Sequence, residues 1–167
     1  MNLGNYDPIG NVFEEFALVA GGLVLCATLS SAGSPAGSFF ARHRQFFMLL
    51  FGICPISFGI VHLVGMPGLL GWIPGWLPPS KMFWAYATTL GFFGAAVAIL
   101  TGIRAPLAAR LLTAEIAIFE LLVWLPKLAP GSSNHFFWSG NAISIALVGA
   151  SWVVADSISR HAQPAAS

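Results

Sequence analysis

Five long apolar stretches constrain the fold of this chain more than any other feature. Each is close to the roughly 20 residues that an α-helix needs to cross a hydrocarbon core about 30 Å thick. The segments between them hold turn formers or charged residues and are too short for a second domain. The sequence therefore predicts one all-α integral membrane bundle over residues 1–167, with transmembrane helices at about 12–31, 46–66, 82–103, 106–125 and 136–156.

Composition points to the same environment. The chain is 57% hydrophobic and 8% charged, whereas a soluble domain carries roughly 25% charged residues. So few charges cannot cover a water-soluble surface, and the expected partner is the lipid bilayer. A net charge of +1 gives no field that would attract nucleic acid.

Motifs of common enzyme classes are missing from the sequence. It holds no phosphate-binding glycine loop, no H-E-x-x-H and no nucleophile elbow. Cys26 and Cys54 lie in different apolar stretches without a C-x-x-C arrangement, and buried thiols are usually inert. No two of the four histidines stand at i and i+4 on one predicted helix, so neither a bis-histidyl haem nor a metal site is expected.

Basic residues predict the orientation, because Lys and Arg in short loops stay on the cytoplasmic side. Five of them fall in alternate loops and the C-terminal tail: Arg42, Arg44, Arg104, Arg110 and Arg160. The other loops hold only Lys81 and Lys127. This predicts an N-terminus on the outer side of the membrane and a C-terminus on the cytoplasmic side. The alternative for 12–31 is a helix that lies on the surface or packs loosely.

Aromatic residues mark the predicted outer ends of the helices. Five of the six tryptophans lie there, where amphipathic rings suit the headgroup region: Trp72, Trp76, Trp84, Trp124 and Trp138. The outer segment 67–81 interleaves Trp with Pro and Gly and is expected to lie in the interface. It could be a lid over a site that opens outward or simply an aromatic belt. Ser80 is placed to cap the next helix.

Small residues predict close helix packing, which is how helices associate in lipid. Gly91, Gly94 and Ala98 form such a stripe on 82–103, and it could serve the bundle or a homo-oligomer. Pro55 should kink 46–66, with Ser57 able to satisfy part of the freed backbone.

Polar groups at membrane depth are the candidate site residues, because a charge at the bilayer centre costs roughly 2.5 to 3.5 kcal/mol. His62, Glu120 and Asn141 lie at compatible depths and could converge beneath the outer loop, with Trp76 above them. A carboxyl, an imidazole and an amide could bind and protonate a quinone head group, since His titrates near neutral pH.

The other reading of these groups is structural. Glu120 would then join its helix to the one that carries His62 through a hydrogen bond. Glu115 lies about 140° around the helix axis from Glu120 and is expected to pack against a hydroxyl such as Thr88, Thr89 or Thr113. Ser144 is a further intramembrane polar residue.

The order of these features resembles the DoxX-like family of small bacterial membrane proteins, which are four-helix bundles. The resemblance begins at Phe58–Leu63 (FGIVHL), includes WIPGWLPPSKMFWAY, GFFGAAVAILTG and RAPLAARLL, and ends with Leu125–Lys127 and the helix that begins near Trp138 and Asn141. The resemblance covers about two thirds of the chain. No single motif is specific to the family, and the resemblance depends on the order and spacing of the motifs. The positions that match motif residues of the family are His62, Trp76, Pro78 and Lys127.

Two departures accompany the resemblance. Many relatives carry a histidine two residues before the L-P-basic element, where this sequence has Val123 and Trp124. The stretch 12–31 would be an extra N-terminal helix on the four-helix core, which makes five in total.

The resemblance implies a quinone-linked or non-catalytic membrane component of a redox enzyme assembly in a bacterial inner membrane, with quinone as the expected ligand and redox-enzyme subunits as partners. Two alternatives stay open. One is a small proton-coupled transporter that uses Glu120. The other is a purely structural anchor or assembly subunit, in which Gly94 and its neighbours hold a partner.

Overall fold

The computed structural model describes residues 8–30, 34–128 and 134–162, which form helices and their connections with no strand among them. In chain order the helices are α1 (Pro8–Leu29), α2 (Pro35–Val64), α3 (Met66–Trp72), α4 (Lys81–Thr101), α5 (Ala105–Phe119), the π-helix η2 (Glu120–Trp124), the 3₁₀-helix η3 (Leu125–Leu128) and α6 (His135–Ala162). The prediction of an all-α chain is confirmed.

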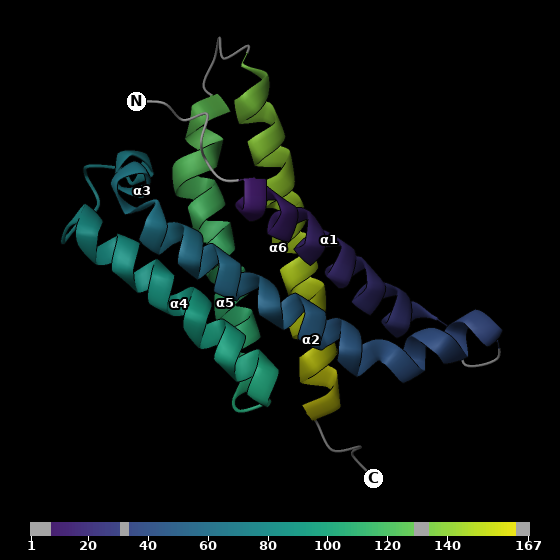
Figure 1. The fold of residues 1–167 in the computed structure, drawn as a ribbon. Helices are drawn as coiled ribbons and strands as arrows, with labels where there is room; N and C mark the ends of the chain where they lie inside the picture. The colour runs from purple at the N-terminus through teal and green to yellow at the C-terminus, as the bar shows by residue number, and fades with distance from the viewer. Residues whose placement is uncertain (1–7, 31–33, 129–133, 163–167) are drawn as a thin grey trace.

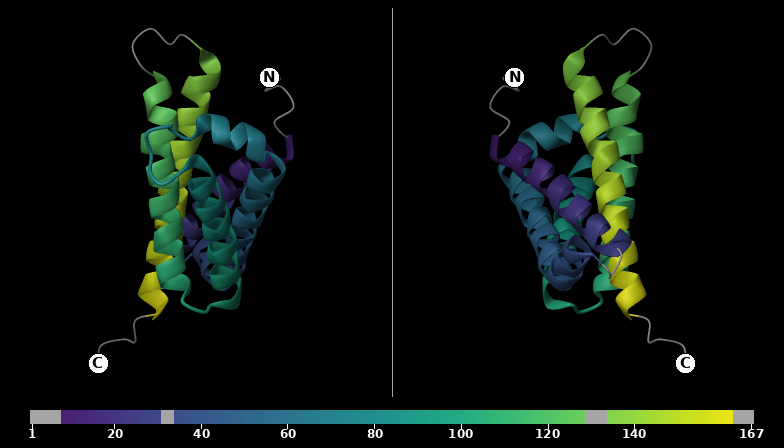
Figure 2. Two further views of the ribbon diagram at one scale, coloured as in Figure 1. Left: turned by 90° about the vertical axis from the view of Figure 1, so that its left-hand side faces the viewer. Right: turned by 90° about the vertical axis from the view of Figure 1, so that its right-hand side faces the viewer.

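The long helices form a closed ring. Each packs on the next along the chain, and α6 returns to α1, so the contacts run α1–α2–α4–α5–α6–α1. Figure 1 shows α5 and α6 as an upright antiparallel pair, crossed by the inclined α1, α2 and α4. The short α3 lies across one end of the bundle, which Figure 2 shows at the top, and we call this the α3 end.

Among the described residues, four helices are long and apolar enough to cross a membrane: Asn11–Leu29, Pro35–Val64, Lys81–Thr101 and His135–His161. Large apolar side chains also cover the outside of the bundle, among them Val12, Leu90, Val97, Leu111, Ile145 and Trp152. An exterior of this kind suits lipid, because contiguous apolar surface is rare on soluble monomers.

The beginning of α2 differs most from the sequence-based boundaries. The predicted helix 46–66 begins at Pro35 instead, inside a segment predicted as a linker. The Ser34 hydroxyl accepts the Gly37 N–H at 3.0 Å, and Pro35 occupies the first turn, where its missing N–H has no consequence. The residues that indicated a turn therefore start the helix.

The other helix boundaries shift less. α4 ends at Gly102, whose φ of 77° is the left-handed conformation that favours glycine at a helix C-terminus. At its start, Ser80 caps it as predicted, since its hydroxyl accepts the Phe83 N–H at 3.1 Å. The predicted helix 136–156 continues to Ala162 as α6. The predicted helix 106–125 changes to a π-helix at Glu120.

Pro55 lies inside α2 without ending it. The expectation that Ser57 satisfies the freed backbone is wrong, because the buried Ser57 hydroxyl oxygen has no hydrogen-bond partner among the described residues.

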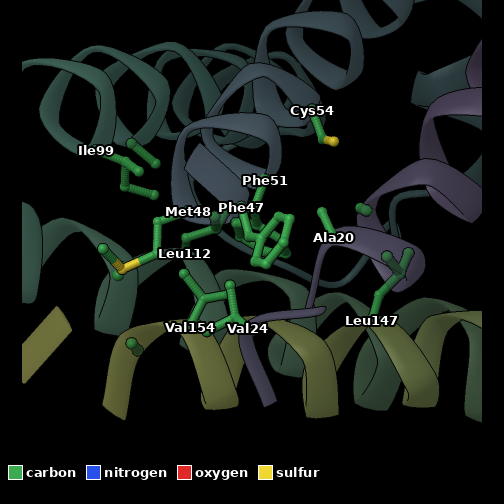
Figure 3. Close-up of a cluster of buried hydrophobic side chains, with 14 of the residues drawn as sticks. Ala20, Val24, Phe47, Met48, Phe51, Cys54, Ile99, Leu112, Leu147 and Val154 are labelled. Carbon is green, nitrogen blue, oxygen red and sulfur yellow. The ribbon is translucent and has the colours of Figure 1, made fainter. Parts of the chain in front are cut away.

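The main core lies toward the end of the bundle opposite α3. Figure 3 shows Phe47 and Phe51 of α2 at its centre, with side chains of the other four long helices around them. Small residues bring α1 against α6 there: a Cβ on Gly21 would lie 2.6 Å from the Ala150 Cβ. This tight contact fixes the crossing of α1 and α6.

The basic residues cluster at this second end, which we call the arginine end. Arg44 of α2 donates to the Ser157 hydroxyl of α6 at 3.3 Å and also contacts His161 Nδ1. Arg104 lies in the connection from α4 to α5, and Arg160 lies in the last turn of α6. The two lysines are at the α3 end, where Lys81 donates to the Leu70 carbonyl at 3.1 Å.

Candidate functional site

A cavity of about 400 Å³ lies inside the ring beneath α3. All five long helices contribute to its walls, and α3 contributes Leu69 and Trp72. Six aromatic rings line it: Phe58, Trp72, Phe92, Phe119, Trp124 and Phe136. Its volume falls in the range of small-molecule sites, which are mostly apolar with a few polar groups.

The crossing of α1 and α6 explains why space opens at this end. The two helices touch at Gly21 and Ala150 and separate toward the α3 end, as both views in Figure 2 show. Asn11, Glu14 and Glu15 of α1 then line one side of the cavity, and the first turns of α6 line the other.

A polar group of three residues lines the cavity between α2, α4 and α5. His62 Nδ1 lies 3.5 Å from the Thr88 hydroxyl oxygen, and Glu115 lines the same wall. The Thr88 hydroxyl donates to the Trp84 carbonyl at 2.9 Å, which leaves its oxygen able to accept from His62 when Nδ1 carries the proton. That tautomer leaves Nε2 as an acceptor for a ligand.

Two phenylalanines hold the His62 ring. Phe92 meets it edge to face with ring centroids 5.1 Å apart, and Phe119 lies at 6.3 Å. These contacts restrict the ring and shield it, so His62 is a fixed hydrogen-bonding group in an apolar wall.

Glu115 packs against α4 where that helix has no side chain. A Cβ on Gly91 would overlap the Glu115 carboxyl, so only glycine leaves room for it. Its Oε1 atom is buried and has no hydrogen-bond partner in the described chain. An unpaired buried acceptor is uncommon and indicates a group that a ligand or a proton can satisfy.

The π-helix determines how the wall beyond Glu115 is built. The Leu125 N–H donates to the Glu120 carbonyl five residues earlier, which widens this turn. Trp124 is thereby turned against Gly140 of α6, where a Cβ would meet its ring, and against Trp72 with ring centroids 5.1 Å apart. Lys127 Nζ lies 5.4 Å from the Trp72 ring centroid.

Asn141 anchors this wide turn to α6. Its amide nitrogen donates to the Trp124 carbonyl at 3.1 Å and to the Phe137 carbonyl at 2.8 Å, and the residue is 2% exposed. Glu120 is 6% exposed and interacts with the Ser144 hydroxyl, yet neither carboxyl oxygen has a hydrogen bond of good geometry.

The predicted site residues thus separate into two groups. His62 and Ser144 line the cavity, together with Glu115, whereas Glu120 and Asn141 lie between η2 and α6 and are not among its lining residues. Trp76 is 69% exposed and also lies outside it. The orientation of α5 about its axis places Glu115, rather than Glu120, on the cavity wall that carries His62. Thr88, one of the three hydroxyl residues expected to pack against Glu115, lines the same cavity.

Sequence reasoning missed several lining residues. Glu14 and Glu15 carry the same signal as Glu115, a carboxyl inside an apolar run, and could have been found by it. Trp72 and Trp124, which the sequence places at the membrane interface, also line the cavity as a tilted pair with ring planes 42° apart. Only the three-dimensional contact with Gly140 identifies the role of Trp124.

A second cavity of about 320 Å³ lies on the outer side of α4 and α5, under Ile73–Leu77. Thr88, Glu115 and Phe119 line both cavities. We call the two spaces the inner cavity and the outer cavity.

Nothing in the described residues forms a metal centre, since no group of three or more His, Cys, Asp or Glu side chains is arranged to hold an ion. Comparison with family models, curated proteins and solved structures gives no match to this chain.

Proposed function

We propose that this protein is a quinone-binding membrane component of a redox enzyme assembly, with the inner cavity as its binding site. The observation that carries the proposal is the pairing of His62 and Glu115 on one wall of an aromatic cavity between apolar helices. A quinone needs flat apolar walls for its ring and hydrogen-bonding groups for its oxygens. The resemblance to DoxX-like proteins favours the same role.

The hydrogen-bonding groups suit the two oxidation states of such a ligand. His62 Nε2 accepts from a quinol hydroxyl, and a protonated Glu115 donates to a quinone carbonyl. In this arrangement the protein binds the head group and exchanges protons with it, while a partner subunit supplies or accepts the electrons.

We further propose five membrane spans in a bacterial inner membrane, with the N-terminus outside and the C-terminus inside. The run of α5, η2 and η3 is the fifth span, because its three segments follow one another without a break from Ala105 to Leu128. The arginine end faces the cytoplasm by the positive-inside rule. The inner cavity then lies in the outer half of the membrane.

Proton-coupled transport is a second candidate. Glu14, Glu15 and Glu115 line the inner cavity, and no Lys or Arg is among its lining residues. Carboxyl groups at membrane depth are typical of proton relays. This candidate predicts solute flux into liposomes that stops in a Glu115→Gln variant.

A structural anchor is the third candidate, favoured by Gly94. It is exposed, and a Cβ there would have nothing within 4 Å, so its small size does not serve this chain's own packing. Gly94→Leu should then release a partner or a second copy while leaving the monomer folded.

Quinone binding in nanodiscs tests the main proposal, with quenching of tryptophan fluorescence as the signal because Trp72 and Trp124 line the cavity. His62→Ala should weaken binding about fivefold, since one lost hydrogen bond is worth about 1 kcal/mol. His43→Ala is the matched control, a histidine on the same helix near the arginine end, bonded to the Phe39 carbonyl. Equal binding by both variants would contradict the proposal.

A further inference from the structure

The outer cavity differs from the inner one in chemistry. Apart from Thr88 and Glu115, its lining is apolar or aromatic. Leu111 and Ile118, which border it, are 61% and 54% exposed, so it faces the surroundings of the bundle rather than its centre. It is a groove on the lipid side of α4 and α5, closed above by Ile73–Leu77.

Only one layer of side chains separates the two cavities. Thr88, Glu115 and Phe119 line both, and the Glu115 carboxyl fills the space between α5 and Gly91 of α4. A ligand that spans this layer would have its polar part beside His62 and its apolar part in the groove.

The side of the inner cavity between α1 and α6 is unsuited to an apolar chain. Asn11, Glu14 and Glu15 line it. Burying apolar chain against carboxylates forfeits their hydration without replacing it. The groove between α4 and α5 is lined by no carboxyl group other than that of Glu115, which belongs to the wall shared by the two cavities.

We propose that the outer cavity holds the isoprenoid tail of the quinone, which reaches the inner cavity from the bilayer between α4 and α5, past Thr88, Glu115 and Phe119. This inference rests on the proposed function and names its ligand class as an amphiphile with a flat polar head and a long apolar tail. Glu115 then has two roles, as part of the passage and as a partner of the head group.

Filling the groove tests the tail site. Ala114 lines the outer cavity but not the inner one, and it is exposed, so Ala114→Phe fills the groove without disturbing the core. In nanodiscs, this variant should bind a long-tailed quinone at least about tenfold more weakly than the wild type, because the phenyl ring occupies the space that the tail needs and the tail loses its packing contacts with α4 and α5. It should bind a tail-less benzoquinone unchanged, which also shows that the inner cavity is intact.

Ala146→Phe is the matched control, an exposed alanine on α6 that borders neither cavity, and it should bind both quinones as the wild type does. Ala87→Phe fills the groove from the α4 side and should repeat the Ala114→Phe result.

The possible failures are distinguishable. If the wild type binds both quinones and Ala114→Phe changes neither affinity, the tail leaves elsewhere and the inference is overturned while the proposed function stands. If Ala114→Phe displaces only a co-purified phospholipid, the groove is a lipid acyl site and the inference is again overturned. If the wild type binds neither quinone, the proposed function fails and the tail site with it.

Discussion

The two ends of the bundle treat buried polar groups differently. At the arginine end three buried serine hydroxyls are satisfied: Ser151 donates to the Val148 carbonyl at 2.9 Å, Ser159 donates to the Ala155 carbonyl at 2.7 Å, and Ser157 accepts from Arg44. Toward the α3 end, Glu115, Glu120 and Asn141 keep buried oxygens without a hydrogen bond.

The two ends also differ in how completely side chains fill the space between the helices. The core residues drawn in Figure 3 fill the space around α2 toward the arginine end, and both cavities lie toward the α3 end. Unsatisfied polar atoms and empty volume both lower stability, so their concentration at one end is typical of a site that trades stability for binding. The arginine end supplies the rigidity on which this site depends.

Gly21→Leu should have the largest effect on stability, because it disrupts the Gly21–Ala150 contact at which α1 and α6 cross. The new side chain would begin 2.6 Å from the Ala150 Cβ and 3.1 Å from its Cα, so the helix backbones must move apart. We expect a loss of about 3 kcal/mol in the free energy of unfolding, the upper part of the usual range for overpacking. Denaturant titration in detergent measures it.

The neighbouring glycine provides the control. Gly22 is exposed, and a Cβ there would have nothing within 4 Å, so Gly22→Leu should leave stability unchanged or slightly raised. Equal losses in the two variants would mean that the α1–α6 contact does not organise the bundle.

Asn141→Ala should have an intermediate effect at the opposite end. It removes two hydrogen bonds to backbone carbonyls, one of which holds the π-helix, and leaves the Trp124 carbonyl without that donor. We expect a loss of about 2 kcal/mol, together with a shift in tryptophan emission as Trp124 loosens from Trp72. Ser139→Ala is the control, since the Ser139 hydroxyl bonds only within its own helix turn, to the Phe136 carbonyl at 3.1 Å. An unchanged emission spectrum in Asn141→Ala would contradict the anchoring role.

The sequence predicted the positions of the long helices because each apolar run is long enough to show its extent directly. It did not predict the start of α2, because Pro35 and Gly37 occur both in turns and in first helical turns, and only the Ser34 cap decides between them. Nor did it predict the π-helix at Glu120, since no residue type specifies an i to i+5 turn.

The candidate site was predicted only in part for a related reason. Depth along a helix follows from counting residues, and it placed His62 correctly beneath the outer segment. Rotation about the helix axis depends on what each helix packs against, here Glu115 on Gly91. The choice between Glu115 and Glu120 therefore required the structure.

Glu115→Met should have the smallest effect on stability and, unlike the other variants, a favourable one. Methionine is unbranched and flexible enough to follow the glutamate side chain past Gly91, and it removes a buried oxygen that has no hydrogen bond. Replacing an unpaired buried polar group with an apolar one should raise the free energy of unfolding by about 1 kcal/mol. Quinone affinity should fall in the same variant, because the head group loses its donor. A variant that loses both stability and affinity would show that Glu115 holds α4 to α5, and the contrast between the two ends would then rest on Glu120, Asn141 and the cavities.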